Sequence, residues 1–183
     1  EAAGGLYWLE PIAENYIEAF DHVVCLGVGG SSLGAKTLCA LAAPPAAGER
    51  PRLHFMDNID PDSFAVLFGA IDPARTGFIV TSKSGATAET LTQFLIALDW
   101  MRSALPGVPL GDHFTIITQP GPRPLRRLAE EFAMTILDHD ANIGGRYAGL
   151  SVVGLLPALI AGLDGEALRQ GAADTLQPLL DGA

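Results

Sequence analysis

A run of hydroxyl side chains with one lysine and one glycine, TSKSGATAET at residues 81–90, is the stretch best suited to chemistry. It follows the apolar run 77–80 and precedes a helical pattern over residues 91–100, so we expect a strand, a loop and a helix in that order. The first N–H groups of a helix lack partners and carry the positive end of its dipole, which favours a bound anion. The stretch therefore predicts a phosphate site.

Ordinary helix capping is the alternative reading of the same stretch. Helix starts favour Ser or Thr with a following Glu, and Thr87-Ala88-Glu89 fits that use. A cap, however, needs one hydroxyl and gains only about 1 kcal/mol from it. The remaining hydroxyls and Lys83 need another explanation.

The overall charge limits the partners of this chain. Its 183 residues carry a formal net charge of −10, whereas nucleic acids and acidic membranes require clustered Lys and Arg, so we expect neither partner. Lys36 and Lys83 are its two lysines, and a lysine inside a hydroxyl-rich loop of so acidic a chain favours contact with an anion. With 49% hydrophobic residues, the length suits a single globular domain over residues 1–183.

Cysteine content and the chain ends suggest a cytoplasmic protein. Cys25 and Cys39 have neither metal-ligand spacing nor the density of a disulfide scaffold, and we expect both to be buried thiols. The first ten residues lack the features of a signal peptide. Because the sequence does not begin with Met and ends at LLDGA, we expect a piece of a longer polypeptide.

Apolar runs and helical patterns alternate along the chain. This alternation predicts an α/β fold: a doubly wound, five-stranded parallel sheet with helices on both faces, of the flavodoxin-like type. Ligands of such sheets bind beyond the carboxyl ends of the strands, so the loops at 29–32, 81–87 and 142–147 should face one crevice. The predicted strands are 23–28, 53–56, 77–81, 114–118 and 135–137, and the predicted helices are 9–20, 33–43, 61–69, 87–103, 125–132, 150–163 and 166–180.

The first loop, GVGGSS at residues 27–32, partly matches three known motifs. Ser32 replaces the third glycine of a dinucleotide fingerprint. As a Walker loop it has one residue too many before Lys36, which turns the lysine about 100° around the helix. GSSLG also matches the nucleophile elbow of serine hydrolases, but His139 is the one late histidine. The four histidines share no ligand spacing, and we predict no metal site.

The third loop, NIGGRY at residues 142–147, joins two glycines to an arginine at the start of an apolar helix. Glycines let a backbone approach a ligand closely, and the guanidinium of Arg146 suits a negative oxygen. The alternative is a structural ion pair between Arg146 and Asp138 or Asp140.

Together, GVGGSSLG at 27–34, SKSGATAET at 82–90 and GGRYAGLSVVGLLPALIAGLD at 144–164 resemble the glucose-6-phosphate isomerase (phosphoglucose isomerase) family in order and spacing. The first two segments also resemble the wider sugar isomerase domain superfamily. The resemblance implies an N-terminal sugar isomerase domain, no cofactor, and a homodimer for the full-length protein. It implies interconversion of glucose 6-phosphate and fructose 6-phosphate through an enediolate.

The resemblance also assigns roles to residues. It implies that Arg146 stabilises the enediolate; that Ser82, Lys83, Ser84 and Thr87 hold the phosphate; and that Gly30, Ser31 and Gly145 line the sugar site. Departures from the common family pattern are Ala86, Ala88 and Ala148, where hydroxyl or amide side chains are usual.

The family's catalytic glutamate, ring-opening histidine and late active-site lysine are expected after residue 183, so the 183 residues alone should bind sugar phosphate weakly and catalyse little. Two alternatives stay open. One is a non-catalytic sugar-phosphate sensor on the same kind of domain. The other is the isomerase part of a fusion with transaldolase.

Overall fold

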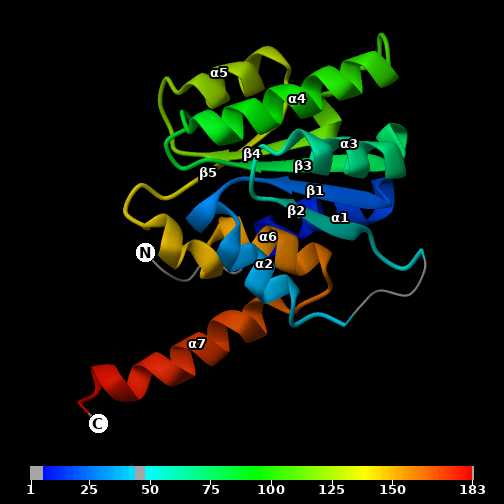
Figure 1. Cartoon of the computed structure of the whole chain (residues 1–183). Helices are drawn as coiled ribbons and strands as arrows, with labels where there is room; N and C mark the ends of the chain where they lie inside the picture. Colours follow the sequence, from blue (N-terminus) through cyan, green and yellow to red (C-terminus); the bar gives the residue numbers. More distant parts are fainter. Residues whose placement is uncertain (1–5, 44–47, 183) are drawn as a thin grey trace.

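A five-stranded sheet, parallel throughout, organises the structure, a computed structural model described here over residues 6–43 and 48–182 (Figure 1). Its strand order is β2-β1-β3-β4-β5. The predicted fold class is thereby confirmed, and this order is the flavodoxin-like form of the doubly wound sheet. The strands are β1 (His22–Leu26), β2 (Arg52–Met56), β3 (Thr76–Thr81), β4 (Phe114–Thr118) and β5 (Thr135–Asp138).

The central strands are buried on both faces. Every residue of β3 and β4 is buried, as expected for strands that read as continuous apolar runs. Alternate side chains enter opposite cores, so Phe78 joins one cluster and Ile79 the other. Along the chain, the direction of winding reverses between β1 and β3, which is where ligands of such sheets bind.

Helices cover both faces of the sheet (Figure 1). Helices α3 (Pro61–Ala70), α4 (Ala88–Ala104) and α5 (Pro124–Glu131) bury one core, which contains Phe64, Phe94 and Leu125. Helices α1 (Glu10–Ala19), α2 (Leu33–Cys39) and α6 (Val152–Ile160) lie on the opposite face, where α1 and α6 contribute Tyr16 and Leu155 to the second core.

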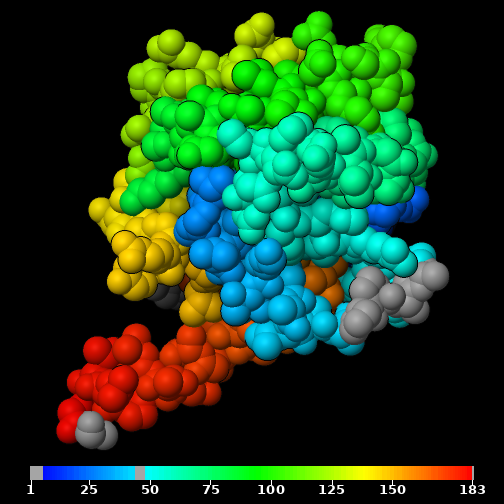
Figure 2. Space-filling view, viewed as in Figure 1, coloured from blue at the N-terminus to red at the C-terminus, as the bar shows by residue number. Residues whose placement is uncertain are grey.

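Helix α7 (Gly165–Leu180) leaves the body of the domain and projects away from it (Figures 1 and 2). Within the described ranges, no helix is both long and apolar enough to cross a membrane. The cysteines carry free thiols: Cys25 is buried, whereas Cys39 is only partly buried, and desolvation raises the pKa of Cys39 to about 12.

Three predicted elements were too long: strand β1, helix α2, and helix α6, which spans Val152–Ile160 rather than 150–163. Strand β1 ends at Leu26 rather than residue 28, because Gly29 adopts a left-handed φ of +55° and opens a short 3-10 turn over Gly29–Ser31. Helix α2 ends at Cys39 rather than residue 43, where the N–H of Leu41 turns back to the carbonyl of Leu38. Pro44 and Pro45, which were expected to stop this helix, lie outside the described residues.

Two histidines of neighbouring strands meet, His22 at the start of β1 and His54 in the middle of β2. Nδ1 of His22 lies 3.0 Å from Nε2 of His54, and their ring centroids are 5.2 Å apart. Desolvation lowers the pKa of His54, and the nearby His22 and Arg52 lower it further. The folded state therefore favours neutral His54.

This shift predicts a pH-dependent stability. Below the ordinary histidine pKa of about 6.5, the unfolded chain protonates residue 54 before the folded chain does, so the free energy of unfolding falls as the pH drops. Urea unfolding at about pH 7.5 and about pH 5.5, on either side of that pKa, should show a smaller loss for His54→Gln than for the unsubstituted chain. Equal losses in both proteins would contradict the prediction.

Candidate functional site

The loop between β3 and α4 forms a small hydroxyl network at the carboxyl edge of the sheet. The hydroxyl of Thr87 lies 2.9 Å from that of Ser82 and 3.3 Å from that of Ser84. The Ser82 hydroxyl also accepts the N–H of Gly85 at 3.1 Å, and Gly85 has a left-handed φ of +63°. Three hydroxyls that the sequence spreads over residues 82–87 therefore gather around one point.

Thr87 stands at the N-cap position of α4 but makes no side-chain cap bond. The capping alternative is therefore wrong for this hydroxyl, which bonds to Ser82 and Ser84 instead. The first N–H groups of α4 keep their donor capacity and the positive end of the dipole beside them. Such an arrangement suits an oxyanion.

Lys83 points from this loop to the third loop. Its ammonium donates a 2.8 Å hydrogen bond to the backbone carbonyl of Ile143, directly before Gly144-Gly145-Arg146. The contact joins residues 60 positions apart. A bond from a side chain to a distant backbone carbonyl leaves no pattern in the sequence, so sequence reasoning missed it.

Arg123, which the sequence analysis also missed, contacts the loop of residues 82–87 (the phosphate loop, after its predicted ligand). Its guanidinium donates to the carbonyl of Ser84 at 3.3 Å and to the side-chain oxygen of Gln119 at 3.0 Å. A Cβ on Gly85 would lie 2.7 Å from Cβ of Arg123, so only glycine fits there. Arg123 follows β4 at the same sheet edge, and the rule that ligands bind beyond strand ends could have pointed to it.

The first and third loops touch backbone to backbone. A Cβ on Gly30 would overlap the carbonyl carbon of Gly145 and lie 2.7 Å from the nitrogen of Arg146. Further along, a Cβ on Gly34 would lie 3.0 Å from Cα of Gly149. Figure 2 shows the gold segment near residue 145 beside the light-blue segment near residue 30. The glycines thus allow a contact that no side chain could enter.

Arg146 lies in a 3-10 turn, Gly145–Leu150, and its side chain is exposed. In residues 6–43 and 48–182 its guanidinium has no hydrogen-bond or ion-pair partner. Asp138 pairs with Arg126 at 2.7 Å instead, and Asp140 accepts the N–H of Asn142. The structural ion pair considered for Arg146 is therefore not formed.

The partial motif matches in the first loop fail on geometry. Ser32 is only 2% exposed, whereas the nucleophile of an elbow must be accessible. Lys36 pairs with Asp57 at 3.3 Å, away from the loop. Ser31 is half-buried in the 3-10 turn beside Gly30. Within the described chain, no group of three or more His, Cys, Asp or Glu residues could hold a metal ion.

The three alanines that depart from the family pattern lie in two environments. Ala86 lies in the phosphate loop and Ala88 at the start of α4, where neither offers a hydroxyl. Ala148 is fully buried in the core between the sheet and α6.

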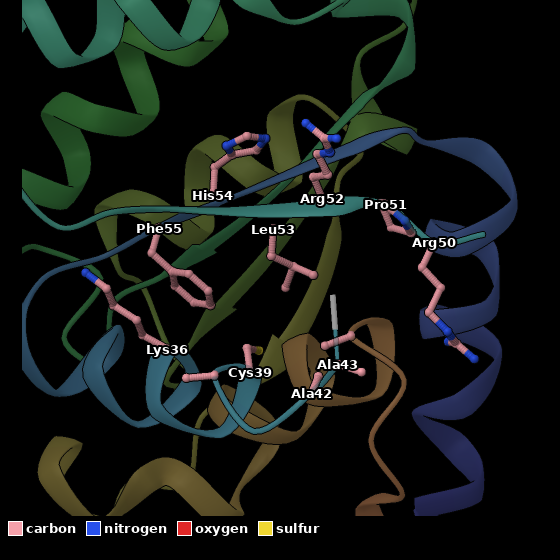
Figure 3. Close-up of a pocket in the computed structure, with 12 residues that line it drawn as sticks. Lys36, Cys39, Ala42, Ala43, Arg50, Pro51, Arg52, Leu53, His54 and Phe55 are labelled. Atoms are coloured by element: carbon pink, nitrogen blue, oxygen red, sulfur yellow. The ribbon is translucent and has the colours of Figure 1, made fainter. Parts of the chain in front are cut away.

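A cavity of about 570 Å³ lies elsewhere, between the edge strand β2 and helix α2 (Figure 3). Leu53 and Phe55 of β2 point toward Cys39 on α2. A second cavity of about 590 Å³ lies at the amino ends of the strands, beside His22 and Arg75. Neither is lined by the phosphate loop or by Arg146.

A doubly wound sheet with a hydroxyl-rich loop before α4 suits a protein that binds a phosphorylated ligand. Comparison with known families agrees: the model described as phosphoglucose isomerase matches residues 14–179. The chain belongs to the phosphoglucose isomerase family.

Similar proteins include two glucose-6-phosphate isomerases. That of Carboxydothermus hydrogenoformans is 36% identical over 173 residues, which are 91% of this chain and 37% of that protein. That of Rubrobacter xylanophilus is 40% identical over 166 residues, 87% of this chain and 38% of that protein. The chain thus spans less than two-fifths of the length of these relatives.

Solved structures show the same likeness. A hypothetical protein from Thermus thermophilus matches with a TM-score of 0.84 and 34% identity, over 92% of this chain and 39% of that one. A glucose-6-phosphate isomerase from Chlamydia trachomatis matches with a TM-score of 0.71 and 27% identity, over 84% of this chain and 29% of that one.

The contact between the loops predicts that Gly30→Ala is destabilising. The new methyl group meets backbone atoms of Gly145 and Arg146, which cannot move aside as a flexible side chain would. We expect a loss of about 1–3 kcal/mol in the free energy of unfolding by urea.

The neighbouring glycine offers a matched control. Gly29 has φ +55° and open space around an added Cβ, and asparagine tolerates this conformation, so Gly29→Asn should cost less than about 1 kcal/mol. Equal stability of Gly30→Ala and the unsubstituted chain would show that the contact is not tight.

Proposed function

We propose that this chain supplies the phosphate anchor and an enediolate-stabilising arginine of a glucose-6-phosphate isomerase. The observation that carries the proposal is the meeting of three loops at one sheet edge, with the start of α4 uncapped beside them. Membership of the phosphoglucose isomerase family narrows the reaction to conversion of an aldose phosphate into a ketose phosphate. The substrates are glucose 6-phosphate and fructose 6-phosphate.

The phosphate end of the substrate is held by hydroxyl and N–H donors. Ser84 and Thr87 supply hydroxyls, Lys83 supplies an ammonium, and the start of α4 supplies backbone N–H groups; Ser82, which is only 1% exposed, orients the Thr87 hydroxyl. Hydrogen bonds to a charged group contribute about 1.5–3 kcal/mol each. Gly30, Ser31 and Gly145 line the adjoining space for the sugar.

The reacting end of the substrate lies against Arg146. When a base moves the proton between C1 and C2, negative charge develops on their oxygens, and a free guanidinium stabilises that charge. The exposed and unpaired state of Arg146 in the described chain supports this role, because the guanidinium has no internal partner to leave. We assign the family's base, its ring-opening histidine and its late lysine to the part of the relatives' length that this chain does not span.

The 183 residues form one sugar isomerase domain of a longer, cytoplasmic isomerase that acts as a homodimer without a cofactor. On their own, these residues bind sugar phosphate weakly and catalyse little isomerisation. The fold alone does not separate this proposal from the sensor alternative, because the Vibrio vulnificus NanR protein complexed with ManNAc-6P matches with a TM-score of 0.52 at 17% identity. The alternative of a fusion with transaldolase can be tested only on the sequence that flanks these residues in the complete protein.

Removing one hydroxyl tests the phosphate anchor. Thr87→Val keeps the shape of the side chain and should weaken binding of 6-phosphogluconate to the chain by roughly tenfold in calorimetry. Thr92→Val is the control, because Thr92 lies on the same helix and bonds only to the carbonyl of Ala88. Equal affinities for both variants would remove Thr87 from the site.

Arg146→Ala tests the catalytic role in a complete isomerase that includes these residues. Loss of a donor to the developing oxyanion should lower kcat by roughly a hundredfold or more and change KM far less. Arg127→Ala removes an exposed arginine of α5 and should leave both constants unchanged. A rise in KM with unchanged kcat would make Arg146 a binding residue instead.

A further inference from the structure

The ammonium of Lys83 connects two loops that the proposed function assigns to opposite ends of the substrate. It belongs to the phosphate loop, yet its 2.8 Å hydrogen bond ends on the carbonyl of Ile143, shortly before Arg146 in the chain. The side chain is half-buried, so water competes less for this bond than on an open surface. The lysine therefore spans the gap between the two loops.

The end of this connection that lies in the phosphate loop is fixed. Backbone hydrogen bonds tie Ser82 to the carbonyl of Ile117 at 3.0 Å and the carbonyl of Lys83 to Gln119 at 3.2 Å. Both partners belong to β4 or the turn after it. The Lys83 side chain thus extends from a backbone segment that is hydrogen-bonded to the next strand of the sheet and the turn after it.

The Arg146 end has fewer hydrogen bonds to other segments, although Ile143 packs against the second core and the turn Gly145–Leu150 contacts α2 and α6. Its local hydrogen bonds run from the N–H of Ile143 to Asp140 at 3.3 Å and from the N–H of Tyr147 to Gly144 at 2.8 Å. Tyr147 is 84% exposed. In the described chain, the bond from Lys83 joins residues 142–147 to the phosphate loop, and the backbone contact at Gly30 joins them to the first loop.

An ammonium has three N–H donors, and Ile143 uses one of them. The other donors remain for oxygens of an anion among Ser82, Ser84 and Thr87. Contact with Ile143 therefore leaves the ammonium with donors for a phosphate.

We propose that Lys83 is a positioning residue whose ammonium bridges a bound phosphate and the carbonyl of Ile143. Occupation of the phosphate site then orders residues 142–147 and holds Arg146 at a set distance from the phosphate. The proposal rests on the proposed function for the phosphate itself, but the tether to Ile143 exists without a ligand. If Lys83 served only as a counter-ion, phosphate binding would not change the order of residues 142–147.

Amide hydrogen exchange of the 183-residue chain tests the tether. Lys83→Met keeps the stem and removes the donors, so exchange at Ile143 and Tyr147 should rise roughly tenfold without ligand. Lys36→Met is the control, because Lys36, the other lysine, pairs with Asp57 after β2 and not with Ile143, and it should leave these amides unchanged. Lys83→Arg retains a donor of similar reach and should restore most of the protection.

Adding inorganic phosphate tests the bridge. In the unsubstituted chain phosphate should slow exchange at Ile143 and Tyr147 by about threefold or more, and in Lys83→Met it should not. Unchanged ligand-free exchange in Lys83→Met, or an equal phosphate effect in that variant, overturns the bridge alone. Absence of phosphate binding at Ser82–Thr87 in the unsubstituted chain overturns the phosphate anchor of the proposed function together with the bridge.

Discussion

The close approach of Gly30 to the backbone of Gly145 and Arg146 is the constraint on which the rest of the site depends. Two peptide segments that are distant in sequence meet there with no side chain between them. Gly34 against Gly149, and Gly154 against Gly149, continue the same contact along α2 and α6. A side chain at Gly30, or at Gly34 against Gly149, would push the turn that bears Arg146 away from the first loop.

A second constraint is electrostatic. The chain carries a net charge of −10, so a phosphate is repelled by most of its surface and needs concentrated local compensation. In the proposed site, that compensation would come from the uncapped start of α4, from Lys83 and, at the opposite side of the site, from Arg146. The hydrogen bonds among Ser82, Ser84 and Thr87 hold the hydroxyls together before any ligand arrives, which lowers the entropic cost of binding.

Much of this arrangement was predictable because it follows from local patterns. The apolar runs of β3 and β4 indicated buried parallel strands, and the carboxyl-end rule placed the three loops at one edge. Contacts with no side-chain signature were not predictable, such as the bond from Lys83 to the Ile143 carbonyl and the support that Arg123 gives to Ser84. The end of α2 was missed because the residues after Cys39 favour helix on propensity alone, whereas the backbone turns at Leu41.

The central claim is that the loops around Ser82–Thr87 and Arg146 form one sugar-phosphate site. The most direct measurement is an amide NMR titration of the chain with fructose 6-phosphate. If the two loops form one site, the amide signals of Gly85–Glu89 and of residues 144–147 should shift with ligand concentration in the same titration. Shifts confined to the cavities beside β2, at Arg50 and Arg52, with both loops unchanged, would contradict it.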